Sequence, residues 1–132
     1  MLLADAAQVS EGKLHVLGGG WRFTGPEPAA SAIGMVFEVP WDLANRPIEF
    51  ELQLVDGDGR AAVLRDGGQL KVEGKLEVGR PPGHPQGASL SAPIAAGIAA
   101  LPLTPGSYEW RLTVNGETDA DWTLPFIVRA AP

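Results

Sequence analysis

The sequence lacks cysteine, clustered basic residues and long apolar runs, and each absence argues against a class of protein. Without cysteine, the 132-residue chain can form neither a disulfide framework nor a thiolate metal site. Its ten Lys and Arg residues are scattered and its formal net charge is −6, which argues against a nucleic-acid partner. Asp5 interrupts the short apolar patch at the amino terminus, so we expect neither a signal peptide nor a membrane span. A cytoplasmic location is the resulting expectation.

Residues with catalytic or metal-binding spacing are also scarce. His15 and His84 are the only histidines, and they form neither an HxH nor an HExxH pattern. No serine occupies the strand-to-helix turn of a nucleophile elbow. The sequence leaves open a catalytic pair of carboxylates, because folding could bring Asp5, Glu38 or Asp42 together. We therefore expect a protein that is not an enzyme and binds no cofactor.

The main pattern that is present is period-two alternation, which predicts β-strands. In the segment 48–55, IEFELQLV, every second residue is apolar, and 122–128, WTLPFIV, repeats the pattern with Trp122 expected to point inward. Further strands are expected at 2–8, 13–24, 32–39, 69–78 and 107–114, and within 88–103. Eight or nine short strands separated by turns predict one all-β domain over residues 1–132, an antiparallel two-sheet sandwich.

Two local signals mark the last hairpin of this predicted domain. Asn115 and Gly116 form the dipeptide that is typical of a type I′ turn. Tyr108 enters a strand directly after a Pro-Gly turn, which is the pattern of a tyrosine corner. We expect its hydroxyl to hydrogen-bond back to the preceding loop.

The three consecutive glycines Gly18, Gly19 and Gly20 allow two interpretations. A phosphate cradle would need a helix directly after the glycines, but the residues that follow have the pattern of a strand. The apolar residues on the two sides of the glycines differ in parity, so one inserted residue would put them on the same face. This favours a β-bulge or strand bend, for which glycine is well suited.

Two pairs of acidic residues could in principle bind a cation. Asp56 and Asp58 resemble the start of a calcium loop, but the positions that follow lack its glycine and its bidentate glutamate, so a hairpin turn is favoured. Asp119 and Asp121 precede the last strand without a third acidic residue close in sequence. We expect them to solvate a hairpin, and cation binding stays open for both pairs.

Asp5 and Trp41 are candidates for special roles. Alternation places Asp5 on the face of Leu3, so an inward carboxylate would need hydrogen-bond donors or a basic partner such as Lys13. Trp41 lies between two predicted strands, where it could close one end of the domain. Alternatively, it could form a platform for a small ligand or carbohydrate, together with His84 and the proline-rich loops.

A charge-free stretch suggests self-association. No Asp, Glu, Lys or Arg occurs in 81–108, although such residues make up 20% of the chain. Either this stretch contains a strand that is covered on both faces, or Ile94, Ile98 and Leu101 belong to an interface, where charge is depleted. Val36 on the segment 32–39 could extend such an apolar patch. We expect a homo-oligomer or another protein partner.

Several segments resemble a family of short bacterial proteins that is catalogued only as a domain of unknown function. They are LLADAAQVSEGKLHVLGGGW, FELQLVDGDGR, PGSYEWRLTVNG and PFIVR, and in this order they span nearly the whole chain. The resemblance implies an immunoglobulin-like sandwich and brings no catalytic residues. The resulting prediction is a structural or protein-interaction module, and the alternative is a small-ligand module that uses Trp41.

Overall fold

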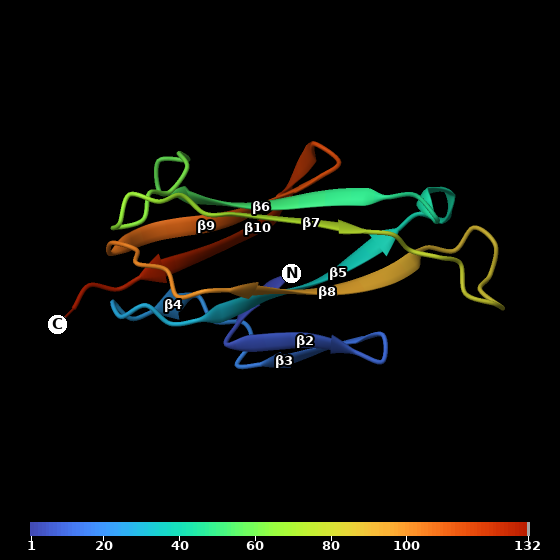
Figure 1. Cartoon of the computed structure of the whole chain (residues 1–132), viewed down its shortest axis with the longest axis horizontal. Coiled ribbons are helices and arrows are strands. Elements are labelled where there is room, and N and C mark those ends of the chain that lie inside the picture. Colours follow the sequence, from blue (N-terminus) through green and yellow to red (C-terminus); the bar gives the residue numbers. More distant parts are fainter. Residues whose placement is uncertain (132) are drawn as a thin grey trace.

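The computed structural model describes residues 1–131, which form ten strands and one short 3₁₀ turn (Figure 1). The all-β prediction is confirmed, but the expected strand number is too low because two expected segments each divide into two strands. Residue 132, the end of the expected domain, lies outside the described residues. The elements are β1 (Leu2–Ala4), β2 (Ala6–Ser10), β3 (Lys13–Leu17), β4 (Phe23–Thr24), β5 (Ser31–Val39), η1 (Trp41–Leu43), β6 (Ile48–Asp56), β7 (Lys71–Leu76), β8 (Leu90–Ile98), β9 (Gly106–Val114) and β10 (Glu117–Val128).

The strands are divided among two larger sheets and a hairpin. The three-stranded sheet has the order β1-β5-β8, and the five-stranded sheet has the order β4-β10-β9-β6-β7. β10 and β4 run parallel, so the expectation of purely antiparallel pairing is wrong at this edge. Figure 1 shows the β2–β3 hairpin beside the three-stranded sheet, on the side away from the five-stranded sheet.

The core lies between the two larger sheets. Trp110 of β9 is 2% exposed, and it packs in one cluster with Ile33 of β5 and Leu52 of β6, both 0% exposed. The four apolar positions that alternation predicted within 48–55 are all buried. Alternating side chains of facing sheets therefore form the core, as expected for two packed sheets.

The three glycines form a turn between strands, and the expected bulge within one strand is wrong. β3 pairs with β2 in the hairpin, whereas β4 belongs to the five-stranded sheet. Gly18 and Gly20 have φ angles of 62° and 88°, which glycine adopts readily. The N–H of Gly20 donates to the carbonyl of Leu3 at 2.6 Å and ties the turn to β1. The parity change thus marks the passage of the chain from the hairpin to another sheet.

Asp5 is exposed, so the expected buried carboxylate is wrong. β1 ends directly before Asp5 and β2 begins directly after it in a different sheet, so alternation does not continue through this position. The ion pairs of the described residues do not include Asp5 or Lys13. Instead, the Asp5 carboxylate covers Gly18, where an added Cβ would lie 2.7 Å from Asp5 Cγ.

Both local predictions around β9 are confirmed. Asn115 and Gly116 have φ angles of 49° and 80° and form the two-residue turn between β9 and β10. The hydroxyl of Tyr108 donates to the carbonyl of Thr104 at 2.6 Å, as in a tyrosine corner. The buried Tyr108 ring also stacks on Phe126, with ring centroids 5.8 Å apart.

Tyr108→Phe is expected to lower the free energy of unfolding by about 0.5–1.5 kcal/mol, because the Thr104 carbonyl loses a partly buried donor. Urea denaturation would measure the change as a shift in midpoint at constant slope. Thr104→Val is the control, since it removes only the second contact, from the Thr104 hydroxyl at 3.0 Å. A Tyr108→Phe midpoint equal to that of the wild type would contradict a stabilising corner.

Candidate functional site

A groove of about 610 Å³ opens between β5 of one sheet and the β9–β10 hairpin of the other. Core side chains such as Phe37 and Leu112 line its base. Four large apolar side chains line it and are between 37% and 55% exposed: Met1, Val36, Leu43 and Trp122. Large exposed apolar side chains gathered at one hollow are typical of binding surfaces.

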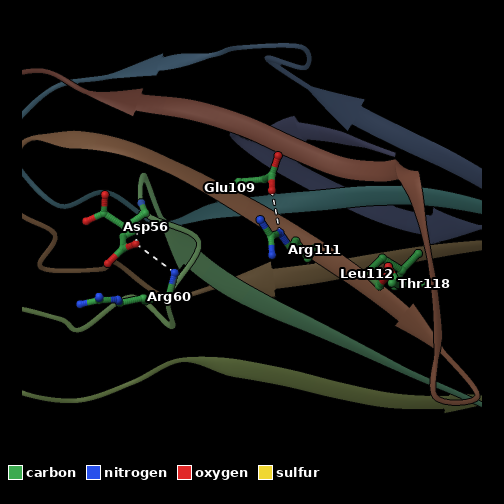
Figure 2. Close-up of polar contacts among 7 residues, drawn as sticks. Asp56, Arg60, Glu109, Arg111, Leu112 and Thr118 are labelled. Atoms are coloured by element: carbon green, nitrogen blue, oxygen red, sulfur yellow. Dashed lines mark hydrogen bonds and ion pairs between the residues drawn. The ribbon is translucent and has the colours of Figure 1, made fainter.

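An irregularity in β10 places Trp122 at this groove. Thr118 pairs with Thr113 and Thr123 pairs with Arg111, so residues 119–122 of β10 lie opposite Leu112 alone. The Thr118 hydroxyl donates to the Leu112 carbonyl at 2.8 Å (Figure 2). Such an insertion redirects side chains. The prediction that Trp122 points inward is therefore wrong, and its side chain is 37% exposed.

The edge of β5 is open along the same groove. β1 pairs with β5 only at Ala32, Ile33 and Gly34, while β8 pairs with β5 along its whole length on the other side. Within residues 1–131, no strand pairs with the first side of β5 from Val36 to Val39. These residues also line the groove. An edge strand of this kind presents unpaired N–H and C=O groups.

The charged side chains that line the groove are all acidic. Glu38 comes from β5, and Glu117 and Asp121 come from β10. All three residues are exposed, and the residues lining the groove include no Lys or Arg. Met1 also lines the groove and carries the α-amino group, so the lining has three carboxylates and one ammonium. The groove therefore combines an apolar surface with a net negative charge.

Trp41 and His84, the two residues expected at a ligand site, do lie together. Their rings are stacked with centroids 5.9 Å apart and planes at 10°. The guanidinium of Arg80 lies 4.1 Å from the centroid of the Trp41 ring and donates to the Trp41 carbonyl at 2.8 Å. His84 Nε2 lies 3.1 Å from the carbonyls of Ala88 and Ser89. These contacts tie the β7–β8 loop to η1, which favours the structural interpretation of Trp41.

Ile94, Ile98 and Leu101 do not form the exposed patch that was expected. Ile98 is 4% exposed in the core, and Ile94 and Leu101 are half-buried against that core. The β2–β3 hairpin covers part of the other face, where Gly34 makes room for Leu14. The charge-free stretch thus includes a strand with one face in the core and the other face covered only in part, since Ser91 and Gly97 are exposed, and this favours the intramolecular alternative. Self-association stays a prediction, without these three side chains as its surface.

Both acidic pairs take part in local turns. Asp56 Oδ1 accepts the N–H of Asp58 at 2.9 Å and the N–H of Arg60 at 3.1 Å (Figure 2). Asp119 Oδ1 accepts the N–H of Asp121 at 2.8 Å and so braces the irregular part of β10. Among residues 1–131, no three His, Asp or Glu side chains are grouped so that they could hold a metal ion.

The three carboxylates considered for catalysis lie apart, and Asp42 of η1 lines neither of the two hollows that the other two line. Asp5 lines a smaller cavity of about 230 Å³, next to Trp21 and Pro26, whereas Glu38 lines the groove. Trp21 Nε1 is buried and has no hydrogen-bond partner in the described residues. The fold therefore does not unite Asp5 with Glu38.

The charged row on β7 (Lys71, Glu73, Lys75) alternates in sign, as is typical of a solvated sheet face. Lys71 Nζ lies 2.9 Å from Glu73 and 3.4 Å from Glu51. The hydrogen bond to Glu73, followed by that to Glu51, raises the pKa of Lys71. Because these side chains are well exposed, their ion pairs contribute little to stability.

Sequence reasoning anticipated Val36 as part of an apolar patch but missed the groove. Its position depends on Trp122, which alternation assigned to the core. The available signal was the polar segment NGETDAD at 115–121, which breaks the alternation directly before Trp122. No periodicity indicates how far β1 extends along β5.

The fold and the groove define an all-β protein of two packed sheets with an open, apolar and acidic edge. The chain belongs to a family of unknown function (DUF6941), whose model matches residues 1–129. No curated protein and no solved structure matches the chain. Within residues 1–131, no helix has the length and apolarity that crossing a membrane requires.

Proposed function

We propose that this protein is a non-catalytic interaction module that binds a segment of another protein in the groove between β5 and the β9–β10 hairpin. The observation that carries this proposal is the gathering of Met1, Val36, Leu43 and Trp122 around one hollow. Exposed apolar surface is unfavourable in water, and a bound partner would remove it from water. The groove is also large enough for several side chains of such a partner.

The alternative function, a small-ligand or carbohydrate module at Trp41, has less support. A sugar stacks on the open face of an aromatic ring, but Arg80 lies over Trp41 and His84 stacks with it. One of the proline-rich loops expected near this site, the loop that contains Pro26, lines a different cavity. A ligand at Trp41 would have to compete with these contacts.

The proposal extends to the class and location of the protein. The hydrogen bond of Tyr108 and the shared core of two sheets support an immunoglobulin-like sandwich. The lack of cysteine is compatible with a reducing, cytoplasmic compartment, and a bacterial source is proposed on the sequence resemblance. A second copy of this chain is another candidate partner for the groove.

Selection from a random peptide-display library tests the proposed function. We expect the wild type to enrich a set of peptides and Val36→Asp to weaken their binding by roughly tenfold or more, because a charge then stands on the apolar surface. Val63→Asp is a matched control, since Val36 and Val63 are both 55% exposed and Val63 lies outside the groove. Calorimetric titration of the enriched peptides would measure the affinities.

Two results would contradict the proposed function. One is that the folded wild type enriches no peptide. The other is equal loss of binding in Val36→Asp and Val63→Asp, which would assign the effect to charge anywhere on the surface. Circular dichroism of each variant would establish that the fold is kept.

A further inference from the structure

The backbone of β5 directs hydrogen-bonding groups toward the groove side. Val36 pairs with Pro93 of β8, and proline has no N–H to donate. The Val36–Pro93 pair must therefore be of the kind whose backbone groups point away from each other. Val36 and, two residues further on, Glu38 then direct their N–H and C=O groups toward the open edge.

The register of β1 agrees with this direction. The carbonyl of Leu3 accepts the N–H of Gly20 and so points away from β5, which makes Leu2 and Gly34 the hydrogen-bonded pair. Gly34 has the same parity as Val36 and Glu38. A strand added beyond β1 would continue the same ladder along β5. The opposite edge of the sheet, β8, contains Pro93, and proline on an edge discourages pairing. The free part of β5 is thus the better template for an added strand.

The charge of the groove favours a basic occupant. Glu38, Glu117 and Asp121 line it without a basic side chain among the lining residues. In a twofold dimer, a second copy would bring the same carboxylates to the same groove, and such like-charge contacts are unfavourable. In an added strand, Lys or Arg on the face of Val36 and Glu38 would cover Val36 with its aliphatic stem and bring its charge to Glu38. The apolar residues of the strand would then lie on the opposite face and meet Phe37 and Trp122.

On the basis of the proposed function, we propose that the partner is an extended protein segment in which apolar residues alternate with Lys or Arg. It adds as a strand to the free edge of β5 between Val36 and Val39. Backbone hydrogen bonds and apolar contacts hold the segment, as in other cases of strand addition. The acidic side chains orient it and accelerate its association.

Calorimetry of the whole chain with defined peptides tests this inference. The first probe is a blocked seven-residue peptide of alternating Lys and Val, and the second has Glu in place of Lys. We expect the Lys peptide to bind, the Glu peptide to bind at least roughly tenfold more weakly, and higher salt to weaken the Lys peptide. A triple variant, Glu38→Gln with Glu117→Gln and Asp121→Asn, is expected to bind both peptides equally. Its three positions are exposed, so the fold should persist.

Backbone methylation tests the pairing itself. In a strand, the Val amides face one side and the Lys amides face the other. We expect N-methylation of one set to abolish binding of the Lys peptide and N-methylation of the other set to leave it intact. Equal binding of both methylated peptides would overturn strand addition.

Other outcomes separate this inference from the proposed function. Binding of the Glu peptide as tight as that of the Lys peptide would overturn the basic partner. If neither defined peptide binds, the basic partner is overturned as well. The random library contains every charge pattern, so enrichment of peptides from it would still support the groove as a binding site. Dimerisation of the wild type that Val36→Asp abolishes would identify a second copy as the occupant and overturn the inference.

Discussion

Trp110→Ala is expected to lower the free energy of unfolding by about 3–5 kcal/mol. Trp110 is 2% exposed and is the largest of the fully buried side chains. Its strand, β9, lies between β10 and β6, where Trp110 pairs with Leu124 and Leu54. Removal of the indole would leave a cavity at the middle of the five-stranded sheet, where paired backbones restrict collapse.

Urea denaturation followed by circular dichroism would measure the effect of Trp110→Ala. Trp122→Ala is the matched control, because it makes the same chemical change at a position that is 37% exposed. We expect the control to change stability by less than about 1 kcal/mol. If Trp110→Ala does not fold, Trp110→Phe should still show a smaller loss. Equal loss in Trp110→Ala and Trp122→Ala would contradict the assignment of Trp122 to the surface.

Features that depend on adjacent residues could be predicted from the sequence. Alternation identified β6 because every second side chain meets the core. The turn at Asn115 and Gly116 depends on the φ angles that these two residues tolerate. The hydrogen bond of Tyr108 reaches only four residues back along the chain. Each of these features needs no knowledge of a distant strand.

Features that depend on strand register could not be predicted in the same way. Alternation cannot detect that residues 119–122 lie opposite Leu112 alone, because this depends on where β9 and β10 pair. Trp122 therefore lies at the groove although its parity matches that of Leu124. The prediction of a buried carboxylate at Asp5 is wrong for a related reason, since the chain passes from one sheet to another at this residue.

The candidate site also depends on an edge, which is a property of the whole sheet. Val36 could be recognised as apolar, but its exposure follows from the short extent of β1. Ile98 has the same apolar character and is 4% exposed, because it lies on the face of β8 that packs into the core. Composition alone therefore does not distinguish the exposed Val36 from the buried Ile98. The arrangement of the strands around each residue does.

A glycine on the edge strand β7 leads to the second large expected effect. Gly74 pairs with Phe50 of β6, and a Cβ at Gly74 would lie 2.5 Å from Cε1 of the Phe50 ring. This ring is 8% exposed and packs on Phe37 with centroids 5.6 Å apart. The glycine therefore provides the space into which the aromatic ring of the neighbouring strand extends, a known way of covering a glycine in a sheet.

Gly74→Val is expected to lower the free energy of unfolding by about 1–3 kcal/mol, because the Phe50 ring must move within a packed core. Gly97→Val is the control, since Gly97 also lies in a strand, β8, and has no atom within 4 Å of an added Cβ. Valine suits strands better than glycine, so the control should match or exceed wild-type stability. Urea midpoints of the two variants would distinguish a steric effect at Phe50 from a general response to replacing a strand glycine. Equal midpoints would mean that the Phe50 ring does not need the space at Gly74.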